Sequence, residues 1–319
     1  MNPDLPDAAA ELGSTATRLF ERLGAVDIAR GAEKDPSHRR TVVADALRRL
    51  GTEDLDPRAD ADALAAAAAL CEAAGRVALP YPVPAVLLGD GEGVPFAVVP
   101  HDCARVDHGD LFDEWRVATL HGPTASAVHK GGLLGSRLGP FVTDLVPDGR
   151  EQATAEAGGA PGDVALNLVL SAWQVLGTVE RAVELAVEHV SGRIQFAKPL
   201  AAFQAVQFQL ADAAVAAAGL RELAHFTLWR LTVAPSHAAV DGLALRLHAL
   251  EVARAVLRTA QQLHGAAGVC DEYDISVLCR HVQPLMRLPF GAERTAVELG
   301  DAIESAGFAG LFAHGRVGP

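Results

Sequence analysis

The stretch Gln262-Leu263-His264-Gly265-Ala266-Ala267-Gly268 follows a long polar and apolar run and stands just ahead of Asp271-Glu272-Tyr273. Leucines recur through that run at the spacing of one helix face, at positions Leu243, Leu247, Leu250 and Leu257. The same pattern places three arginines outward, Arg246, Arg254 and Arg258. Because glycine is the commonest residue just past a helix end, Gly265 is expected to stop this helix.

Other long helices are predicted around it. Over residues 201–231 the apolar residues recur in steps of three and four, as Phe203, Val206, Leu210, Ala213, Ala217, Leu220 and Ala224. Residues 163–190 and 291–305 have helical patterns of their own. Four such helices with short connections predict a four-helix bundle, which packing must stabilise because each buried Leu or Phe contributes about 1.5–3 kcal/mol.

The amino-terminal part is also predicted to be helical. Residues 8–23 form a candidate helix, Ser37 can cap a helix that stops at Gly51, and residues 61–74 form an alanine-rich helix that Asp60 caps and Gly75 closes. Pro80-Tyr81-Pro82-Val83-Pro84 follows as a turn.

Between the helical parts the sequence pattern changes to short apolar runs separated by Gly, Asp and Pro. Residues 96–99, 116–120 and 141–146 are predicted to be β-strands, and residues 151–163 a linker. The glycine-rich segment at 131–136 lacks the order of a phosphate or dinucleotide loop and is interpreted as a turn. The expected domains are residues 1–93, 94–158 and 159–319.

Composition excludes several classes of protein. The 319 residues are 50% hydrophobic with a formal charge of −13, and the scattered Lys and Arg give no basic face for nucleic acid. The first residues are polar and acidic, and no run of about 18 uncharged apolar residues occurs, so neither a signal peptide nor a membrane span is expected and the location is expected to be cytoplasmic. Four cysteines without metal-ligand spacing, Cys71, Cys103, Cys270 and Cys279, are interpreted as free thiols, and no metal is expected.

Three motifs in order carry a resemblance to a known family. They are Arg193-Ile194-Gln195-Phe196-Ala197, Phe203-Gln204 and the Gln262–Gly268 stretch, with Asp212 between them. In this order and spacing they resemble the carboxyl half of the acyl-CoA dehydrogenases. The resemblance implies a mainly α fold, with an amino-terminal helical domain, a middle β domain much shortened here, and a carboxyl-terminal four-helix bundle.

The resemblance also implies a share in binding FAD. In that family the Arg of an Arg-x-x-Phe-Gly motif reaches FAD that the neighbouring subunit largely holds, which gives this role to Arg193, Phe196 and Gln204. A planar guanidinium suits phosphate oxygens because it donates paired hydrogen bonds. The family's second contact is the turn containing Gln262, Gly265 and Ala266. Ala197 and Ala266 stand where the family has glycine. The alternative is structural: Arg193 and Gly265 would each merely cap a helix end.

The expected catalytic base is missing. Pro289-Phe290-Gly291-Ala292 stands where the family has Tyr-Glu-Gly-Thr, so Phe290 replaces the glutamate that removes the α-proton. The other position used by relatives falls near Asn167, which is neutral. Glu293 is a weak candidate, one helical turn away. Ala292 and Arg294 replace small polar residues, and His264 and His281 are interpreted as structural histidines.

Two hypotheses follow from the resemblance. In the first, the chain is an inactive subunit of a heterotetrameric FAD-dependent acyl-CoA dehydrogenase, paired with a homologous catalytic subunit and acting on an acyl-CoA such as a steroid side-chain thioester. In the second, it is a scaffold or interaction protein that binds no flavin. A self-sufficient dehydrogenase ranks third, because it would need an unrecognised base.

Overall fold

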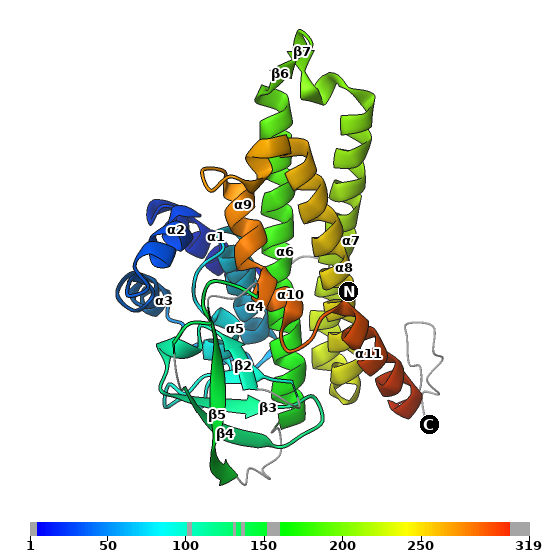
Figure 1. Ribbon diagram of the computed structural model, residues 1–319. Helices are drawn as coiled ribbons and strands as arrows, with labels where there is room; N and C mark the ends of the chain where they lie inside the picture. Colours follow the sequence, from blue (N-terminus) through cyan, green and yellow to red (C-terminus); the bar gives the residue numbers. More distant parts are fainter. Residues whose placement is uncertain (1–4, 101–103, 130–131, 135–137, 152–159, 307–319) are drawn as a thin grey trace.

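The computed structural model describes residues 5–100, 104–129, 132–134, 138–151 and 160–306. Long helices dominate it, and a small sheet lies beside the lower half of the longest one (Figure 1). The Cys103 position falls outside the described residues, as do parts of the turn predicted at 131–136 and of the linker predicted at 151–163.

Short and medium helices form the amino-terminal part: α1 Asp7–Arg22, α2 Asp27–Lys34, a π-helical turn η1 Arg39–Val43, α3 Ala44–Arg49, α4 Ala61–Arg76 and α5 Val83–Leu87. The Asp60 side chain accepts a hydrogen bond from the Ala63 N–H at 2.8 Å, which confirms the predicted cap of α4. Helix α4 does not stop at Gly75 as predicted but continues to Arg76.

Five strands of the described residues form one sheet in the order β1-β3-β4-β5-β2. They are β1 Phe96–Val98, β2 Ala104–Asp107, β3 Glu114–Ala118, β4 Thr124–His129 and β5 Val142–Glu151, with the 3-10 turn η2 Gly109–Leu111 after β2. β1 pairs parallel with β3 and the other pairs are antiparallel. The three predicted strands match β1, β3 and β5, and the prediction missed β2 and β4.

The carboxyl-terminal part is a bundle of long helices. It contains α6 Ala160–Gly192, α7 Gln204–Val233, α8 Ala238–His264 and α11 Ala292–Ala306, with the hairpin β6 Ile194–Gln195 and β7 Lys198–Pro199 after α6. Short connecting elements are η3 Leu200–Ala202, η4 Pro235–His237, η5 Gly265–Val269, α9 Asp274–His281 and α10 Gln283–Arg287. Figure 1 shows the hairpin projecting beyond the body of the molecule at the far end of α6 from the sheet. This arrangement confirms the predicted fold class.

Helix α6 is the centre of the core. It packs between α4 on one side and α7 and α8 on the other, and its fully buried residues include Trp173, Leu176 and Val179. It is also the one described helix long and apolar enough to cross a membrane, but 83% of its most apolar window is buried within the protein. A core helix has this character because neighbours cover it on all sides.

Two glycines let α4 and α6 touch backbone to backbone. A Cβ on Gly75 would lie 1.8 Å from the Gln174 carbonyl oxygen, and one on Gly177 would lie 2.0 Å from the Glu72 carbonyl oxygen. The Thr178 hydroxyl donates to the Gly75 carbonyl at 2.9 Å. Gly75 is therefore needed for helix packing and not as a helix stop.

One prediction about side-chain direction is wrong. Arg246 was expected to point outward from α8, but it is buried, with 2% of its surface exposed. Arg254 and Arg258 are exposed as predicted.

Candidate functional site

Arg193 lies at the base of the projecting hairpin. Its backbone N–H donates to the His189 carbonyl at 2.9 Å, which ends α6, and its carbonyl accepts from the Leu200 N–H at 2.9 Å, which closes the hairpin. Every residue from 191 to 199 is exposed. Within the described part of the chain the Arg193 guanidinium makes no hydrogen bond or ion pair, so its charge is available to a ligand or partner.

The hairpin turn holds two side-chain-bearing residues in the left-handed region. Phe196 has φ 54° and Ala197 has φ 64°, and the Phe196 side chain is 85% exposed. For residues with a Cβ this conformation costs about 1–2 kcal/mol each, which explains why glycine suits the position of Ala197. Such strain at an exposed aromatic residue is typical of a contact site.

The Gln262 turn lies beside the base of this hairpin. His189, four residues before Arg193, stacks on His264 with ring centroids 4.3 Å apart, and Tyr273 packs edge-on against both rings. Gln204, Gln262, Gly265 and Ala266 are all exposed at this end of the bundle. The fold thus brings together the residues that the sequence assigned to FAD, while their cofactor role stays a prediction.

The glycines of this turn also have structural roles. Gly265, at φ 61° and ψ −137°, is the carboxyl cap of α8, as the structural alternative expected. A Cβ on Gly268 would lie 2.6 Å from the Gln261 carbonyl oxygen, so this glycine allows the turn to fold back on its own helix. His264 donates its Nδ1–H to the Ala260 carbonyl at 2.7 Å. It is a satisfied histidine within the packed end of the bundle.

Phe290 lies against a buried arginine. Arg246 Nη2 donates to the carbonyl oxygens of Leu288 and Phe290 at 2.7 and 2.8 Å, and its guanidinium carbon is 5.9 Å from the Phe290 ring centroid. Burial lowers the pKa of Arg246 to about 10. The arginine therefore fixes the loop in which the family has its glutamate, although no carboxylate is there.

The other candidate bases lie in different surroundings. Glu293 is exposed in the first turn of α11 and is not among the residues that line the cavity described below. Asn167 is nearly buried and lines the cavity described below. His281 lines it too, and its Nε2 lies 2.6 Å from Glu33 Oε1. Burial lowers the pKa of His281, whereas the bond to Glu33 opposes that shift.

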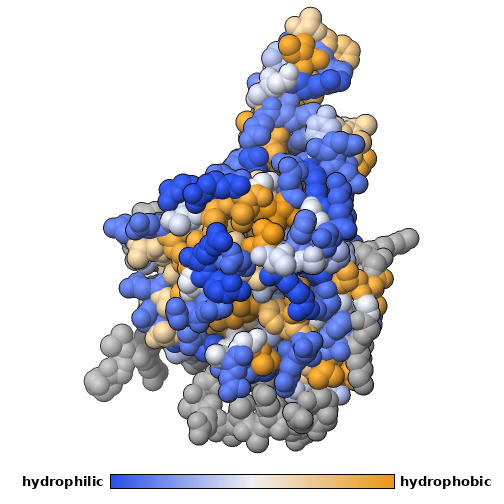
Figure 2. Space-filling view, turned by 90° about the vertical axis from the view of Figure 1, so that its left-hand side faces the viewer, coloured by the Kyte–Doolittle hydropathy of each residue, from blue (hydrophilic) through white to orange (hydrophobic). Residues whose placement is uncertain are grey.

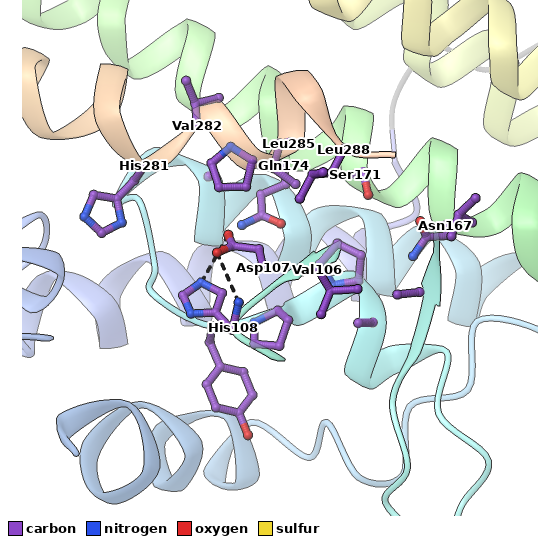
Figure 3. A pocket seen from close by; sticks show the side chains of 18 of the residues that line it. Val106, Asp107, His108, Asn167, Ser171, Gln174, His281, Val282, Leu285 and Leu288 are labelled. Carbon is purple, nitrogen blue, oxygen red and sulfur yellow. Dashed lines mark hydrogen bonds and ion pairs between the residues drawn. The ribbon is translucent and has the colours of Figure 1, made fainter. Parts of the chain in front are cut away.

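A cavity of about 100 Å³ lies where α6, the turn before α5, the sheet and the α9–α10 corner meet (Figure 3). Its walls are mainly apolar, with Leu79, Val106, Trp115 and Leu285 among them. Polar groups enter from one face of α6, namely Asn167, Ser171, Gln174 and Thr178. This volume is well below the roughly 300–1,000 Å³ of sites for cofactor-sized ligands.

Asp107, at the end of β2, is the carboxylate that lines the cavity. Its Oδ1 accepts from the His108 backbone N–H at 3.1 Å, and its Oδ2 lies 3.4 Å from His108 Nε2 (Figure 3). The Asp107 side chain is 23% exposed, and the residue lines the cavity. Burial raises the pKa of Asp107 to about 7, against the opposing effects of the His108 N–H and Arg39.

His108 is oriented by a buried arginine. Arg39 Nη1 lies 3.2 Å from His108 Nδ1, and the same guanidinium forms a paired contact with the Asp110 carboxylate at 3.0 and 2.5 Å. Because arginine only donates, Nδ1 of His108 must accept, which leaves the hydrogen on Nε2 facing Asp107. Burial, Arg39 and His281 lower the pKa of His108 well below its usual value. His108 also has φ 55°, a strained conformation for this residue.

The sequence pattern does not indicate Asp107, His108 or Arg39 as site residues. Asp107 ends a four-residue strand with weak alternation and His108 follows it directly, while Arg39 lies about 70 residues upstream in a π-helical turn. The available signal was an Asp-His pair before Gly109. That pair gains meaning only when the fold encloses it.

The comparisons with known proteins agree with this architecture. Residues 167–299 match the acyl-CoA dehydrogenase carboxyl-terminal domain. Acryloyl-CoA reductase (NADH) of Anaerotignum propionicum is 36% identical over 107 residues, which are 34% of this chain and 27% of that protein. The acyl-CoA dehydrogenase IpdE2 of Mycolicibacterium smegmatis is 30% identical over 125 residues, which are 39% of this chain and 38% of that protein. The chain thus matches about a third of the length of these relatives.

Solved structures share the fold over almost the whole chain. One chain of the ChsE4-ChsE5 complex from Mycobacterium tuberculosis matches with a TM-score of 0.79 at 18% identity, over 97% of this chain and 100% of that one. A chain of the Tcur3481-Tcur3483 steroid ACAD G363A variant matches with a TM-score of 0.75 at 20% identity, over 94% of this chain and 98% of that one. Residues 167–299 thus form an acyl-CoA dehydrogenase carboxyl-terminal domain, and the chain as a whole has the fold of these structures.

Proposed function

We propose that this chain is a subunit of an FAD-dependent acyl-CoA dehydrogenase and contributes FAD-binding residues to a homologous catalytic subunit. The observation that carries the proposal is the exposed hairpin. Arg193 and Phe196 are exposed on the hairpin, and among the described residues the Arg193 guanidinium has no hydrogen-bond partner. Phe290, by contrast, lies in the loop where the family has its catalytic glutamate. The residues proposed for cofactor contact are therefore exposed, and the family's glutamate is replaced by Phe290.

The residues around Arg193 suit the pyrophosphate of FAD, whereas the cavity does not suit its flavin ring. The Arg193 guanidinium is exposed and has no acidic partner in the part of the chain that the structure describes. It suits a pyrophosphate, because charge-assisted hydrogen bonds to phosphate are strong. His189 and His264 lie beside Arg193, and neither brings a negative charge that would compete with a phosphate for the guanidinium. A cavity of about 100 Å³ is too small for a flavin ring. This difference supports a cofactor held mainly by the partner.

Helix α7 supports a large subunit interface. Of its 30 residues only six are buried, although its sequence is apolar on most sides. Phe208, Val215 and Trp229 are 60%, 71% and 38% exposed, and their spacing of seven or fourteen residues places them in one stripe along the helix. Phe196 and Ile194 extend the apolar surface onto the hairpin tip, which stands clear of the body in Figure 2. Apolar surface on this scale indicates a protein partner.

The kind of partner and substrate is proposed by analogy. Two of the similar structures are complexes, and one is described as a steroid ACAD. The proposed assembly is a heterotetramer located in the cytoplasm, and its substrate is an acyl-CoA, with a steroid side-chain thioester as the favoured class.

In the proposed reaction the chemistry supplied by bound FAD would be acceptance of the hydride from the β-carbon of the acyl-CoA. This chain's share is to hold the phosphate side of that cofactor with Arg193 and to cover the interface with α7. The partner's glutamate would take the α-proton, because Phe290 has no group that can accept one.

Co-expression with a homologous full-length dehydrogenase that has an intact Tyr-Glu-Gly-Thr segment tests the proposal. We expect a yellow heterotetramer that oxidises acyl-CoA, whereas the chain alone should retain no flavin and reduce no electron acceptor. Loss of a base removes about 10² to 10⁴ in rate. Robust turnover by the homogeneous chain would contradict the proposal, and Glu293→Gln and Asp107→Asn would then identify its base.

The second candidate function is a scaffold or interaction protein without flavin. The cavity beside α6 favours it, since its volume of about 100 Å³ is well below that of a cofactor site. A stable, colourless monomer whose size and colour a homologous dehydrogenase does not change would favour this alternative. A neighbouring reading frame that encodes a dehydrogenase with an intact Tyr-Glu-Gly-Thr segment would favour the subunit proposal.

A further inference from the structure

Two histidine rings join separate helices at the hairpin end of the bundle. His189 of α6 stacks on His264 of α8 with ring centroids 4.3 Å apart and an angle of 26° between the rings. Tyr273, in the loop before α9, packs edge-on against both rings at 6.2 and 6.3 Å. Figure 1 shows the start of α9 beside the upper part of α6, below the hairpin. The rings therefore hold the Gln262 turn against the end of α6.

The surroundings of the two rings favour their neutral forms. His264 is 7% exposed and donates its Nδ1–H to the Ala260 carbonyl at 2.7 Å, so a proton taken up by this ring must go to Nε2. Burial, His264 and Arg193 lower the pKa of His189 below its usual value. Arg193 and the Tyr273 ring are the other groups that face the pair, and within the described residues no carboxylate forms an ion pair with either histidine.

Acid would place two positive charges in this stack. The first is opposed little, because His189 and His264 lie in the last turns of their helices, where a partial charge of roughly −0.5 favours a cation. The second would bring two full like charges together in rings whose centroids are 4.3 Å apart, with Arg193 nearby. This repulsion outweighs the attraction of the helix ends, because the Coulomb energy grows with the product of the charges and falls with distance.

We propose that the His189–His264 stack is a pH-sensitive latch, which holds the Gln262 turn against α6 while the two rings carry at most one proton and opens when both are protonated. Opening also releases the base of the hairpin, since the Arg193 N–H is bonded to the His189 carbonyl at 2.9 Å. That it would separate two flavin contacts rests on the proposed function. The latch itself requires neither flavin nor partner, so its failure and the failure of the flavin-sharing proposal are separate results.

The direction of the pH dependence follows from the lowered pKa of His189. The folded chain binds fewer protons than the unfolded chain, whose histidines have a pKa of about 6.5. The stabilisation by the latch is therefore complete above about pH 6.5 and is lost as the pH falls through the lower pKa of the folded state.

Hydrogen exchange of the full chain at pH 7.5 and pH 4.5, corrected for the intrinsic rates, tests this opening. We expect amides of residues 189–200 and 262–273 to exchange at least about tenfold faster at pH 4.5, while the core of α6 around Trp173 stays protected. Equal protection of the two segments at both pH values would overturn the proposal. So would an acid-induced loss of protection that is uniform along the chain.

Variants assign the effect to the two rings. His189→Phe and His264→Phe each keep an aromatic ring and remove one charge, so either should abolish the faster exchange at pH 4.5. The matched control is His248→Phe, about four turns away on the same helix α8, which should behave like the parent. Acid-induced opening that persists in both ring variants would show that other groups cause it.

Histidine NMR titration measures the coupling directly. In the parent chain His189 should titrate at a lower pH than an unperturbed histidine, and in His264→Phe its midpoint should move to higher pH because one facing charge is removed. A parent His189 that titrates at or above the ordinary value would contradict the latch, and this measurement stands even where a variant fails to fold. An unchanged His189 midpoint in a folded His264→Phe would contradict it as well.

Discussion

Gly75 of α4 and Gly177 of α6 lie where the two helices cross, and a Cβ at either position would collide with the backbone of the other helix. The contact sets how deeply α6 approaches the amino-terminal helices. It also fixes the rotation of α6 that directs Gln174 and Thr178 toward the cavity.

Gly177→Ala should therefore destabilise the protein strongly. The added Cβ would meet a backbone oxygen at 2.0 Å, which no rotamer change can relieve, so we expect a loss of about 3 kcal/mol or more in the free energy of unfolding. Urea denaturation measures it. The control is Gly300→Ala in α11, where nothing lies within 4 Å and the change should stabilise slightly. Equal effects of the two changes on the free energy of unfolding would show that α4 and α6 are not in close backbone contact.

The apolar stripe on α7 predicts a dependence of assembly on Val215. Val215→Glu would bury an unpaired carboxylate in the proposed interface, and we expect association with the partner to weaken at least about tenfold. Analytical ultracentrifugation of the co-expressed chains measures this. Val297→Glu on α11, where the side chain is 54% exposed, serves as the matched control and should assemble normally. Unimpaired assembly of the Val215 variant would place the interface elsewhere.

Arg193→Ala should weaken flavin retention by the complex about ten- to a hundredfold, because a charge-assisted hydrogen bond is lost. Arg193→Lys should rescue it only in part, since lysine keeps the charge without the planar fork. Flavin release during dialysis measures the effect, with assembly checked in parallel. Arg22→Ala at the end of α1 is the control for a helix-end arginine. A variant that keeps flavin but melts earlier would show that Arg193 is only a cap.

The carboxyl group of Asp107 should make stability fall as the pH rises. Its pKa is raised from 3.8 to about 7, so the folded state holds a proton that the unfolded state has already released. The stabilisation is complete below about pH 4 and is lost as the pH rises through 7, by up to about 4 kcal/mol. Glu33 acts in the opposite direction at lower pH. Burial alone would raise its pKa, but hydrogen bonds from His281 and Arg280 lower it to about 2.

Denaturation of the parent and of Asp107→Asn at pH 5 and pH 8 separates these effects. The variant has no proton to lose there, so it should gain stability relative to the parent between the two pH values. Asp113→Asn, an exposed carboxylate, should show no such change. If the parent and Asp107→Asn follow the same pH profile, the carboxyl is not held in its neutral form.

Much of the fold could be predicted because its signals are local. The Asp60 cap and the periodicity of α7 and α8 depend on neighbours within a few turns, and the three strands that were predicted have continuous apolar runs. Arg246 could not be placed, because its burial depends on two carbonyl groups about 42 to 44 residues away. The helical face alone does not show which polar groups a loop will present to it.

One part of the candidate site could likewise be predicted from the sequence and another could not. Arg193 and the Gln262 turn could be recognised because their order and spacing resemble a family motif, and the fold placed them together. Asp107 could not, since its neighbours Arg39, Gln174 and His281 come from three distant segments. Its surroundings exist only in the folded chain.

The exposed stripe of α7 has a further consequence for how much of this chain a cell can maintain. If α7 forms the proposed interface, the lifetime of the folded chain depends on the amount of the partner protein. Copies made in excess would aggregate or be degraded, because unassembled apolar surface promotes both. Supply of the two chains in matched amounts would then be a requirement set by Phe208, Val215 and Trp229, not by the chemistry of the reaction.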